Sequence, residues 1–126
     1  MKPDINKLKE TLQTFDNERR RLSQLIYDLE DVPRIKNLVG KYFKYKNNYN
    51  SQEYWWVYYH VKEFKNNVLF SDYFELDTRS KIEFGTNRES YSMSFFNPNY
   101  TEISKKEYET ALKKLVKYVN QRFNFK

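Results

Sequence analysis

The sequence of 126 residues contains no cysteine, one histidine and two glycines. Without cysteine there is no disulfide, no thiolate metal site and no cysteine nucleophile. A single histidine makes Ser–His and Cys–His catalytic arrangements hard to assemble, and neither glycine stands in a phosphate-binding loop motif. No segment approaches the ~20 apolar residues of a membrane-spanning helix, and the polar N-terminus lacks the apolar core of a signal peptide. We therefore expect an intracellular protein without membrane contact.

Positive charge and aromatic side chains are what the sequence has in excess. The formal net charge is +6, and Phe, Trp and Tyr make up 19% of the residues. The charge permits attraction to nucleic acid or another polyanion, and it equally suits a lysine-rich solvated surface. Tyrosine is the most frequent aromatic residue, and it serves both protein cores and binding surfaces. A chain of this length forms one domain with a real core, with room for a helical appendage.

An amphipathic helix is predicted near the N-terminus, as a coiled-coil unit of residues 1–33. Apolar residues recur there at alternating spacings of three and four, a period that is typical of a coiled-coil seam. The seam positions, of which one is polar, are Ile5, Leu8, Leu12, Phe15, Arg19, Leu22, Ile26 and Leu29. Two interpretations are open: self-association through the seam, or packing of the stripe on the chain's own sheet. We favour a homodimer or higher homo-oligomer, because a stripe this narrow and long exceeds what a small sheet can cover.

Residues 34–126 are predicted to form an α+β body, with an antiparallel sheet of four or five strands and a C-terminal helix packed on it. Pro33 should end the N-terminal helix, because proline disfavours α geometry in the preceding residue. Alternating aromatic and β-branched residues predict a meander with strands at 39–46, 53–64, 68–76, 81–84 and 91–95. The first two strands should pair as a hairpin, and Asn66 and Asn67 suit a two-residue turn. Ser104 and Glu107 form a capping box that starts the last helix.

Catalytic signals in the sequence are poor. His60 lies on the strand 53–64, where a core or partly buried histidine is a better interpretation than a general base. Metal binding would need the four acids Asp72, Glu75, Asp77 and Glu83. The first three of them distantly resemble a nuclease carboxylate cluster. Asp72 should point to the opposite sheet face from Glu75 and Asp77, and the lysine expected after the acidic pair is absent. We interpret these acids as solvated strand and turn residues, and we expect neither an enzyme nor a metal or cofactor site.

The clearest binding candidate is the segment 34–50, which carries five cationic residues and no acid. Lysines can neutralise phosphates while aromatic rings stack on bases, so the segment predicts a surface for nucleic acid or another partner. The residues assigned to this surface are Arg34, Lys36, Lys41, Tyr42, Lys44, Tyr45, Lys46 and Tyr49. An edge strand that carries many lysines also protects a sheet against aggregation, and this protective interpretation is slightly favoured.

Three stretches carry a resemblance to a known group of proteins: residues 38–47 (LVGKYFKYKN), 54–58 (YWWVY) and 100–108 (YTEISKKEY). Together they resemble small accessory proteins of bacteriophages and prophages in low-GC bacteria, which often place a charged coiled coil ahead of such a body. The resemblance implies a viral or mobile-element setting in the cytoplasm of a bacterial host cell. Small phage proteins of this kind often act by binding, including inhibitors of host defence such as anti-CRISPRs. Many inhibitors that mimic DNA are acidic, so the basic charge of this chain disfavours that mechanism.

The leading hypothesis is therefore a non-enzymatic phage accessory protein that binds and inhibits a host macromolecule, such as a defence complex. Its expected partners are a second copy of itself and a host protein or protein–nucleic-acid complex. One alternative is a nucleic-acid-binding module that uses the basic aromatic strand within 34–50. Another alternative is a sponge for a small nucleotide signal, in which a Tyr or Trp ring stacks on the base and Arg79, Arg88 or Lys44 holds the phosphate.

Overall fold

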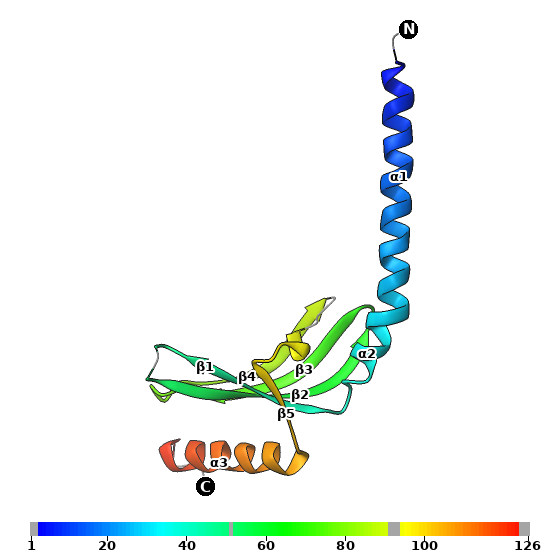
Figure 1. Cartoon of the computed structure of the whole chain (residues 1–126). Coiled ribbons are helices and arrows are strands. Elements are labelled where there is room, and N and C mark those ends of the chain that lie inside the picture. Colours follow the sequence, from blue (N-terminus) through cyan, green and yellow to red (C-terminus); the bar gives the residue numbers. More distant parts are fainter. Residues whose placement is uncertain (1–2, 51, 91–93, 124–126) are drawn as a thin grey trace. The chain divides into compact units, whose positions relative to one another are not determined.

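The computed structural model describes residues 3–50, 52–90 and 94–123 (Figure 1). The chain divides into two compact units, residues 1–37 and residues 38–126. The first unit is helical, and the second is an α+β body with a five-stranded antiparallel sheet and a C-terminal helix. The fold class expected from the sequence is confirmed.

The N-terminal unit consists of helical segments that follow one another directly along the chain. They are helix α1 (Ile5–Ile26), the π-helical turn η1 (Tyr27–Asp31) and helix α2 (Val32–Lys36). Asp4 caps α1, because its Oδ1 accepts hydrogen bonds from the backbone N–H groups of Asn6 at 3.0 Å and Lys7 at 3.3 Å. These N–H groups would otherwise lack partners, and the carboxylate also complements the positive end of the helix dipole.

The helical structure continues past Pro33, where the sequence analysis placed its end. In a regular α-helix proline lacks the N–H donor, and its ring clashes with the carbonyl four residues earlier. The π turn η1 directly precedes α2, which has Pro33 in its first turn, so the hydrogen-bonding pattern has already changed before the proline. The helix ends at Lys36, and the backbone N–H of Asn37 donates to the carbonyl of Pro33 at 3.1 Å. The compact helical unit thus reaches residue 37.

The sheet of the body contains the strands β1 (Tyr42–Asn48), β2 (Tyr54–Lys65), β3 (Val68–Leu76), β4 (Ile82–Ser90) and β5 (Tyr100–Ile103). Their spatial order is β4-β3-β2-β1-β5, and each strand is antiparallel to its neighbours. The predicted hairpin between the first two strands is confirmed. Asn66 and Asn67 connect β2 and β3 with φ angles of 53° and 61°, which is the left-handed geometry that a two-residue hairpin turn requires.

The strand expected at 91–95 is the main error of the sequence analysis. Residues 91–93 lie outside the described part of the chain, and Ser94–Phe96 form a 3₁₀ turn, η2. Phe95 is buried against Phe43 and Tyr59, with ring centroids 4.9 and 5.4 Å away, so its apolar character serves the core without a strand. The fifth strand is β5, which crosses over to pair with β1. The first strand also starts later than 39, because Gly40 adopts a φ of +89° in the preceding turn.

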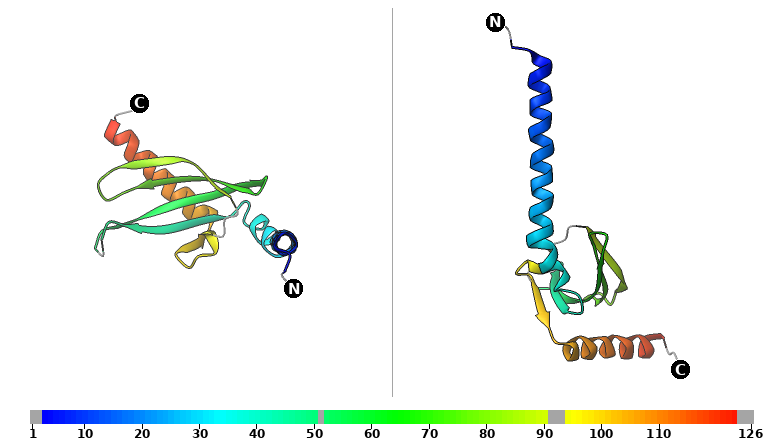
Figure 2. Two further views of the ribbon diagram at one scale, coloured as in Figure 1. Left: turned by 90° about the horizontal axis from the view of Figure 1, so that it is seen from above. Right: turned by 90° about the vertical axis from the view of Figure 1, so that its right-hand side faces the viewer.

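The central strand β2 separates two apolar layers, as its two bulky faces predict. Val57 and Val61 are buried on one face, and Tyr58 contributes to the other. On this second face Phe74 packs against Tyr108 and the rest of helix α3 (Lys105–Phe123). Figures 1 and 2 show α3 along one face of the sheet, where it runs diagonally to the strands. The serine half of the predicted capping box is present, because the Ser104 Oγ accepts a hydrogen bond from the Glu107 N–H at 3.1 Å.

Candidate partner-binding surfaces

The seam of α1 keeps its apolar side chains accessible. No residue of α1 is buried. The seven apolar side chains of the predicted seam have exposed fractions between 44% and 68%. Arg19, the polar member of the seam, has its Nη2 3.8 Å from Oδ1 of Asp16 on the same helix. A single copy of the helical unit therefore leaves the whole stripe in contact with water.

The π turn η1 sets where this stripe ends. Helix α1 has 22 residues in regular α geometry, so the stripe keeps to one face from Ile5 to Ile26, with Arg19 as its one polar member. At ~1.5 Å per residue this is a length of about 33 Å. Leu29 lies inside η1, where the i to i+5 hydrogen bonds widen the turn and rotate the following residues relative to the stripe. Three consecutive heptads therefore present one apolar face, and Leu29 lies beyond the regular part.

His60 is half-buried between the sheet and α3, as expected from the sequence. Its ring stacks on Tyr42, with centroids 4.2 Å apart and an angle of 12° between the planes. Tyr108 of α3 lies 5.8 Å away. Burial lowers the pKa of His60, and the positive charge of Lys62 lowers it further. The imidazole therefore packs as a neutral aromatic ring at neutral pH.

Two of the four acids face each other across the β3–β4 ladder. Glu75 and Glu83 are direct cross-strand partners, and the Trp55 Nε1–H donates to Glu75 Oε2 at 3.4 Å. Burial raises the pKa of Glu75, whereas Lys81, whose Nζ lies 3.0 Å from Glu83 Oε1, lowers the pKa of Glu83. Like charges directly opposite each other destabilise a sheet, so repulsion between Glu75 and Glu83 lowers the stability of the β3–β4 pairing.

The other two acids have partners of their own. Asp77 accepts a 2.7 Å hydrogen bond from the Tyr49 hydroxyl and two more from backbone N–H groups of the β3–β4 turn. Asp72 lies 3.5 Å from the Nζ of Lys62. Within residues 3–50, 52–90 and 94–123, no group of three or more His, Asp or Glu side chains could hold a metal ion.

Strand β1, which contains half of the residues assigned to the basic aromatic surface, lies inside the sheet. It is bordered by β2 along its whole length, and by β5 from Tyr42 to Tyr45. The protective-edge interpretation is therefore wrong for this part of the strand. The reason is the crossover of β5, which covers the edge that a simple meander would leave open. Beyond Tyr45 the β5 pairing stops, and the end of β1 is bordered by β2 alone.

The two lysines in the middle of β1 lie over aromatic rings of β2. Lys44 Nζ is 4.5 Å from the ring centroid of Trp56, and Lys46 Nζ is 4.1 Å from that of Tyr54. Lys44 also forms an ion pair with Glu107 of α3, at 3.3 Å. The chain's own ammonium groups therefore occupy ring faces that a nucleic-acid base would need for stacking.

The remaining members of the predicted surface are dispersed. Lys41 pairs with Glu102 at 3.3 Å, and Tyr42 packs under α3. Tyr45 contacts Tyr100 on the other face of the sheet, with centroids 4.9 Å apart. The Tyr49 hydroxyl is bonded to Asp77, while Arg34 and Lys36 belong to the N-terminal unit. The structure thus does not bring the segment 34–50 together as one basic aromatic surface within the body.

A second apolar surface lies along one flank of α3, and the sequence analysis did not single it out. It is formed by Leu112 and Val116 of the helix, which are 36% and 50% exposed, and by Phe84 of β4, which is 75% exposed. We call these three residues the α3 flank. A cavity of about 480 Å³ between α3, β3 and β4 includes all three in its lining. The wide apolar stripe of the last helix was a signal for it, because that stripe contains Leu112 and Val116 beside the buried Tyr108 and Leu115.

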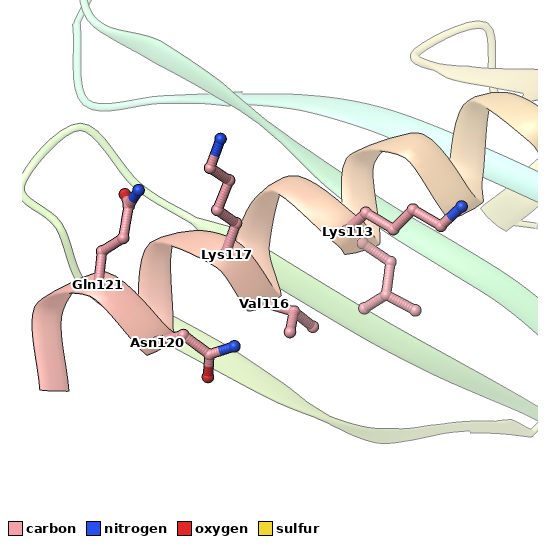
Figure 3. A pocket seen from close by; sticks show the side chains of 6 residues that line it. Lys113, Val116, Lys117, Asn120 and Gln121 are labelled. Carbon is pink, nitrogen blue, oxygen red and sulfur yellow. The ribbon is translucent and has the colours of Figure 1, made fainter. Parts of the chain in front are cut away.

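The flank continues on the outer side of the helix. A shallow depression of about 610 Å³ is lined there by Leu112, Val116 and four polar residues, among them Lys113 and Lys117. Figure 3 shows Val116 and Asn120 directed to one side of α3, with the ammonium group of Lys117 on the other side. Within the described residues, neither Lys113 nor Lys117 forms an ion pair with an acidic side chain.

Comparison with known proteins finds no family model, no curated protein and no solved structure that matches this chain. None of the helices in the part of the chain described here is long and apolar enough to cross a membrane.

The cations proposed for a nucleotide sponge lie far apart in the sheet. Arg79 is in the β3–β4 turn, where its guanidinium lies 4.0 Å from the ring centroid of Tyr49. Arg88 is opposite Phe70, near the other end of β4, and Lys44 is on β1. Strand β4 rises ~3.3 Å per residue, so Arg79 and Arg88 are separated by more than about 20 Å of strand. The three cations therefore do not share one site, and each remains a separate candidate for holding a phosphate.

Proposed function

We propose that the protein is a non-enzymatic accessory protein of a phage or mobile element, which binds and inhibits a host macromolecule such as a defence complex. We further propose that it acts as a homodimer or higher homo-oligomer through α1. The observation that carries the self-association is the exposed heptad stripe of α1, which is apolar except at Arg19 and on which no residue is buried. An exposed stripe with a heptad period is suited to pairing with a second copy.

Two physical arguments support self-association over an isolated helix. A helix of this length is only marginally stable in water without packing partners. Each exposed leucine or isoleucine on it also forgoes part of the ~1.5–3 kcal/mol that full burial would contribute. Pairing two copies of α1 removes both deficits. It also places two identical bodies in one particle, so that a partner with repeated or symmetric sites is held by two contacts at once.

The two alternative functions receive less support from the described geometry. The lysines of β1 lie over Trp56 and Tyr54 of the same sheet, and Arg79 and Arg88 lie over the rings of Tyr49 and Phe70. A partner of macromolecular size requires neither a shared phosphate site nor free stacking faces. It requires accessible apolar surface, which α1 and the α3 flank provide.

The test uses the full chain in a bacterial host. The tagged protein is expressed before infection by a phage that a host defence system restricts, and plaque formation is compared between strains with and without that system. The same tag serves to capture bound host components, which are identified by mass spectrometry. We expect expression to restore infection only in the strain that carries the defence system, and a component of that system to be enriched in the capture.

The control is a chain with the α1 substitutions L12E and L22E, which is expected to lose both effects if two copies are required. Absence of any restored infection across a panel of defence systems, together with no enriched host component, would contradict the proposal. Restoration without enrichment of a defence component would point to an activity other than binding and would contradict it as well.

A further inference from the structure

The α3 flank exists because one helix cannot cover five strands. Strands lie ~4.8 Å apart, so the axes of β4 and β5 are separated by about 19 Å, whereas an α-helix with its side chains is only ~10 Å across. Helix α3 crosses the sheet diagonally, so part of the face at β3 and β4 is left beside it (Figure 2). Phe84 of β4 is on this part of the face, opposite Phe74 in the ladder, and it remains 75% exposed.

The helix itself presents apolar residues toward this uncovered area. At ~100° per residue, Leu112 and Val116 lie successively further round α3 from the buried Tyr108. Asn120 continues the same row, and all three line both the cavity against the sheet and the depression on the outer side. The two hollows therefore adjoin along this row, which spans about two helical turns of α3, and we call them together the groove. Exposed apolar residues along two turns of a helix suit the apolar stripe of another α-helix.

The charged residues of α3 beside the groove are mostly positive. Helix α3 carries six cations, Lys105, Lys106, Lys113, Lys114, Lys117 and Arg122, and two carboxylates, Glu107 and Glu109. Lys113 and Lys117 lie in the lining on the outer side. The one acid in the lining, Asp72, is already paired with Lys62 at 3.5 Å. A second copy of α3 would place lysine against lysine, so this surface does not suit self-association.

We propose that the α3 flank binds an amphipathic helix of a partner protein, with acidic residues beside its apolar stripe. The apolar stripe packs on Phe84, Leu112 and Val116, and the acids meet Lys113 and Lys117, which line the adjoining depression on the outer side of α3. The proposal rests on the proposed function in one respect, namely that the protein acts by binding a macromolecule. It assigns that contact to the face of the body beside α3, and it leaves α1 to self-association.

The test uses three fluorescent peptides of one length with alanine-based helical sequences. The first has leucines at positions i, i+3, i+4 and i+7 with glutamates beside them, the second has lysines in place of the glutamates, and the third keeps the glutamates but replaces the leucines with serine. Binding to the full-length protein is measured by fluorescence anisotropy at physiological salt. We expect only the first peptide to bind, at least about tenfold more tightly than the other two, a difference of ~1.4 kcal/mol.

Variants of the protein locate the contact. K113E with K117E, and separately F84S, should each weaken binding of the first peptide by about tenfold or more. The matched control, K105E with K106E, has the same change of charge on the first turn of α3 and should change binding less than about twofold. These five side chains are exposed or at a helix end, and circular dichroism confirms that each variant is folded.

Several results would overturn the proposal. They are binding of none of the peptides, equal binding of all three, or equal weakening by the control variant. Binding of double-stranded DNA or of anionic vesicles that depends on Lys113 and Lys117 but not on Phe84 would assign the surface to a polyanion instead. Such failures are distinguishable from failure of the proposed function, because a chain with K113E and K117E retains α1 and its oligomeric state can be measured separately.

Discussion

Placing charge in the seam of α1 should dissociate the oligomer while the body stays folded. The perturbation is the double substitution L12E and L22E. Leu12 is 62% exposed and Leu22 is 44% exposed in a single copy. Full burial of a leucine contributes ~1.5–3 kcal/mol, so burial of the exposed remainder contributes on average about 0.8–1.6 kcal/mol for each side chain on pairing. A dimer loses four such contributions, about 3–6 kcal/mol, which weakens association by roughly 10²–10⁴-fold.

The buried carboxylates make the loss larger, because an unpaired charge at an apolar interface carries a desolvation cost. The assay is size-exclusion chromatography with multi-angle light scattering over a range of protein concentrations. Near-ultraviolet circular dichroism of the tryptophans and tyrosines reports on the body in the same samples. The matched control is N6E with N17E, which makes the same change of charge on the outer positions of α1 and should keep the oligomer.

The reasoning is refuted by a wild-type protein that is monomeric at high micromolar concentration. The stripe would then have to pack on the chain's own sheet. It is also refuted if the L12E and L22E chain keeps the mass of the wild-type oligomer, because the contact would then lie elsewhere.

Three further predictions concern the body. Burial lowers the pKa of His60 in the folded state, so the unfolding free energy should decrease as the pH falls below ~6.5. In urea titrations between about pH 7 and 5.5, H60F should remove this pH dependence. A wild-type unfolding free energy that does not change over this range would contradict the prediction. The Lys44 side chain, 23% exposed, places its ammonium group over the Trp56 ring and pairs with Glu107. K44A should therefore lower the unfolding free energy by about 1–2 kcal/mol and K44M by less than half of that, whereas equal losses would mean that packing plays no part. Burial raises the pKa of Glu75 in the folded state, so the folded state loses stability as the pH rises through that pKa and the carboxyl ionises. E75Q should therefore raise the melting temperature at neutral pH by the equivalent of up to about 1 kcal/mol. Near pH 4, E75Q should leave the melting temperature unchanged. A melting temperature that E75Q lowers at neutral pH would show that the Trp55 hydrogen bond outweighs the repulsion from Glu83.

Patterns of short range were sufficient to predict most of the fold. The aromatic alternation within 53–64 gave the central strand, and Asn66 and Asn67 gave the turn, because each depends on neighbours in sequence. The error at Pro33 came from a turn type that leaves no sequence signature, since a π turn is defined by its hydrogen bonds. Strand β5 was missed because four residues, Tyr100 to Ile103, are too few to show a period.

The two candidate surfaces also differ in how far they can be predicted from the sequence. The α1 seam is a repeat along one helix, so its residues can be named from the sequence. The α3 flank depends on the angle at which α3 crosses the sheet and on which strands it leaves uncovered, and Phe84 is 28 residues before Leu112 in the chain. The dispersal of the segment 34–50 has a related cause. Neighbouring residues of a strand point to opposite faces, so a basic aromatic run in sequence does not stay together in space.

The pairing of β1 with β5 has a consequence for the order of folding. The four strands from β1 to β4 pair with their sequence neighbours, but Tyr42 meets Ile103, about 60 residues later, and only then is the sheet complete. Contacts of such long sequence separation form late and slow a folding reaction. On the ribosome, the body cannot close until residue 103 and the start of α3 have left the exit tunnel. During that interval the edge of β1 is open, and its alternating lysines, Lys44 and Lys46, keep a nascent chain from pairing with its neighbours.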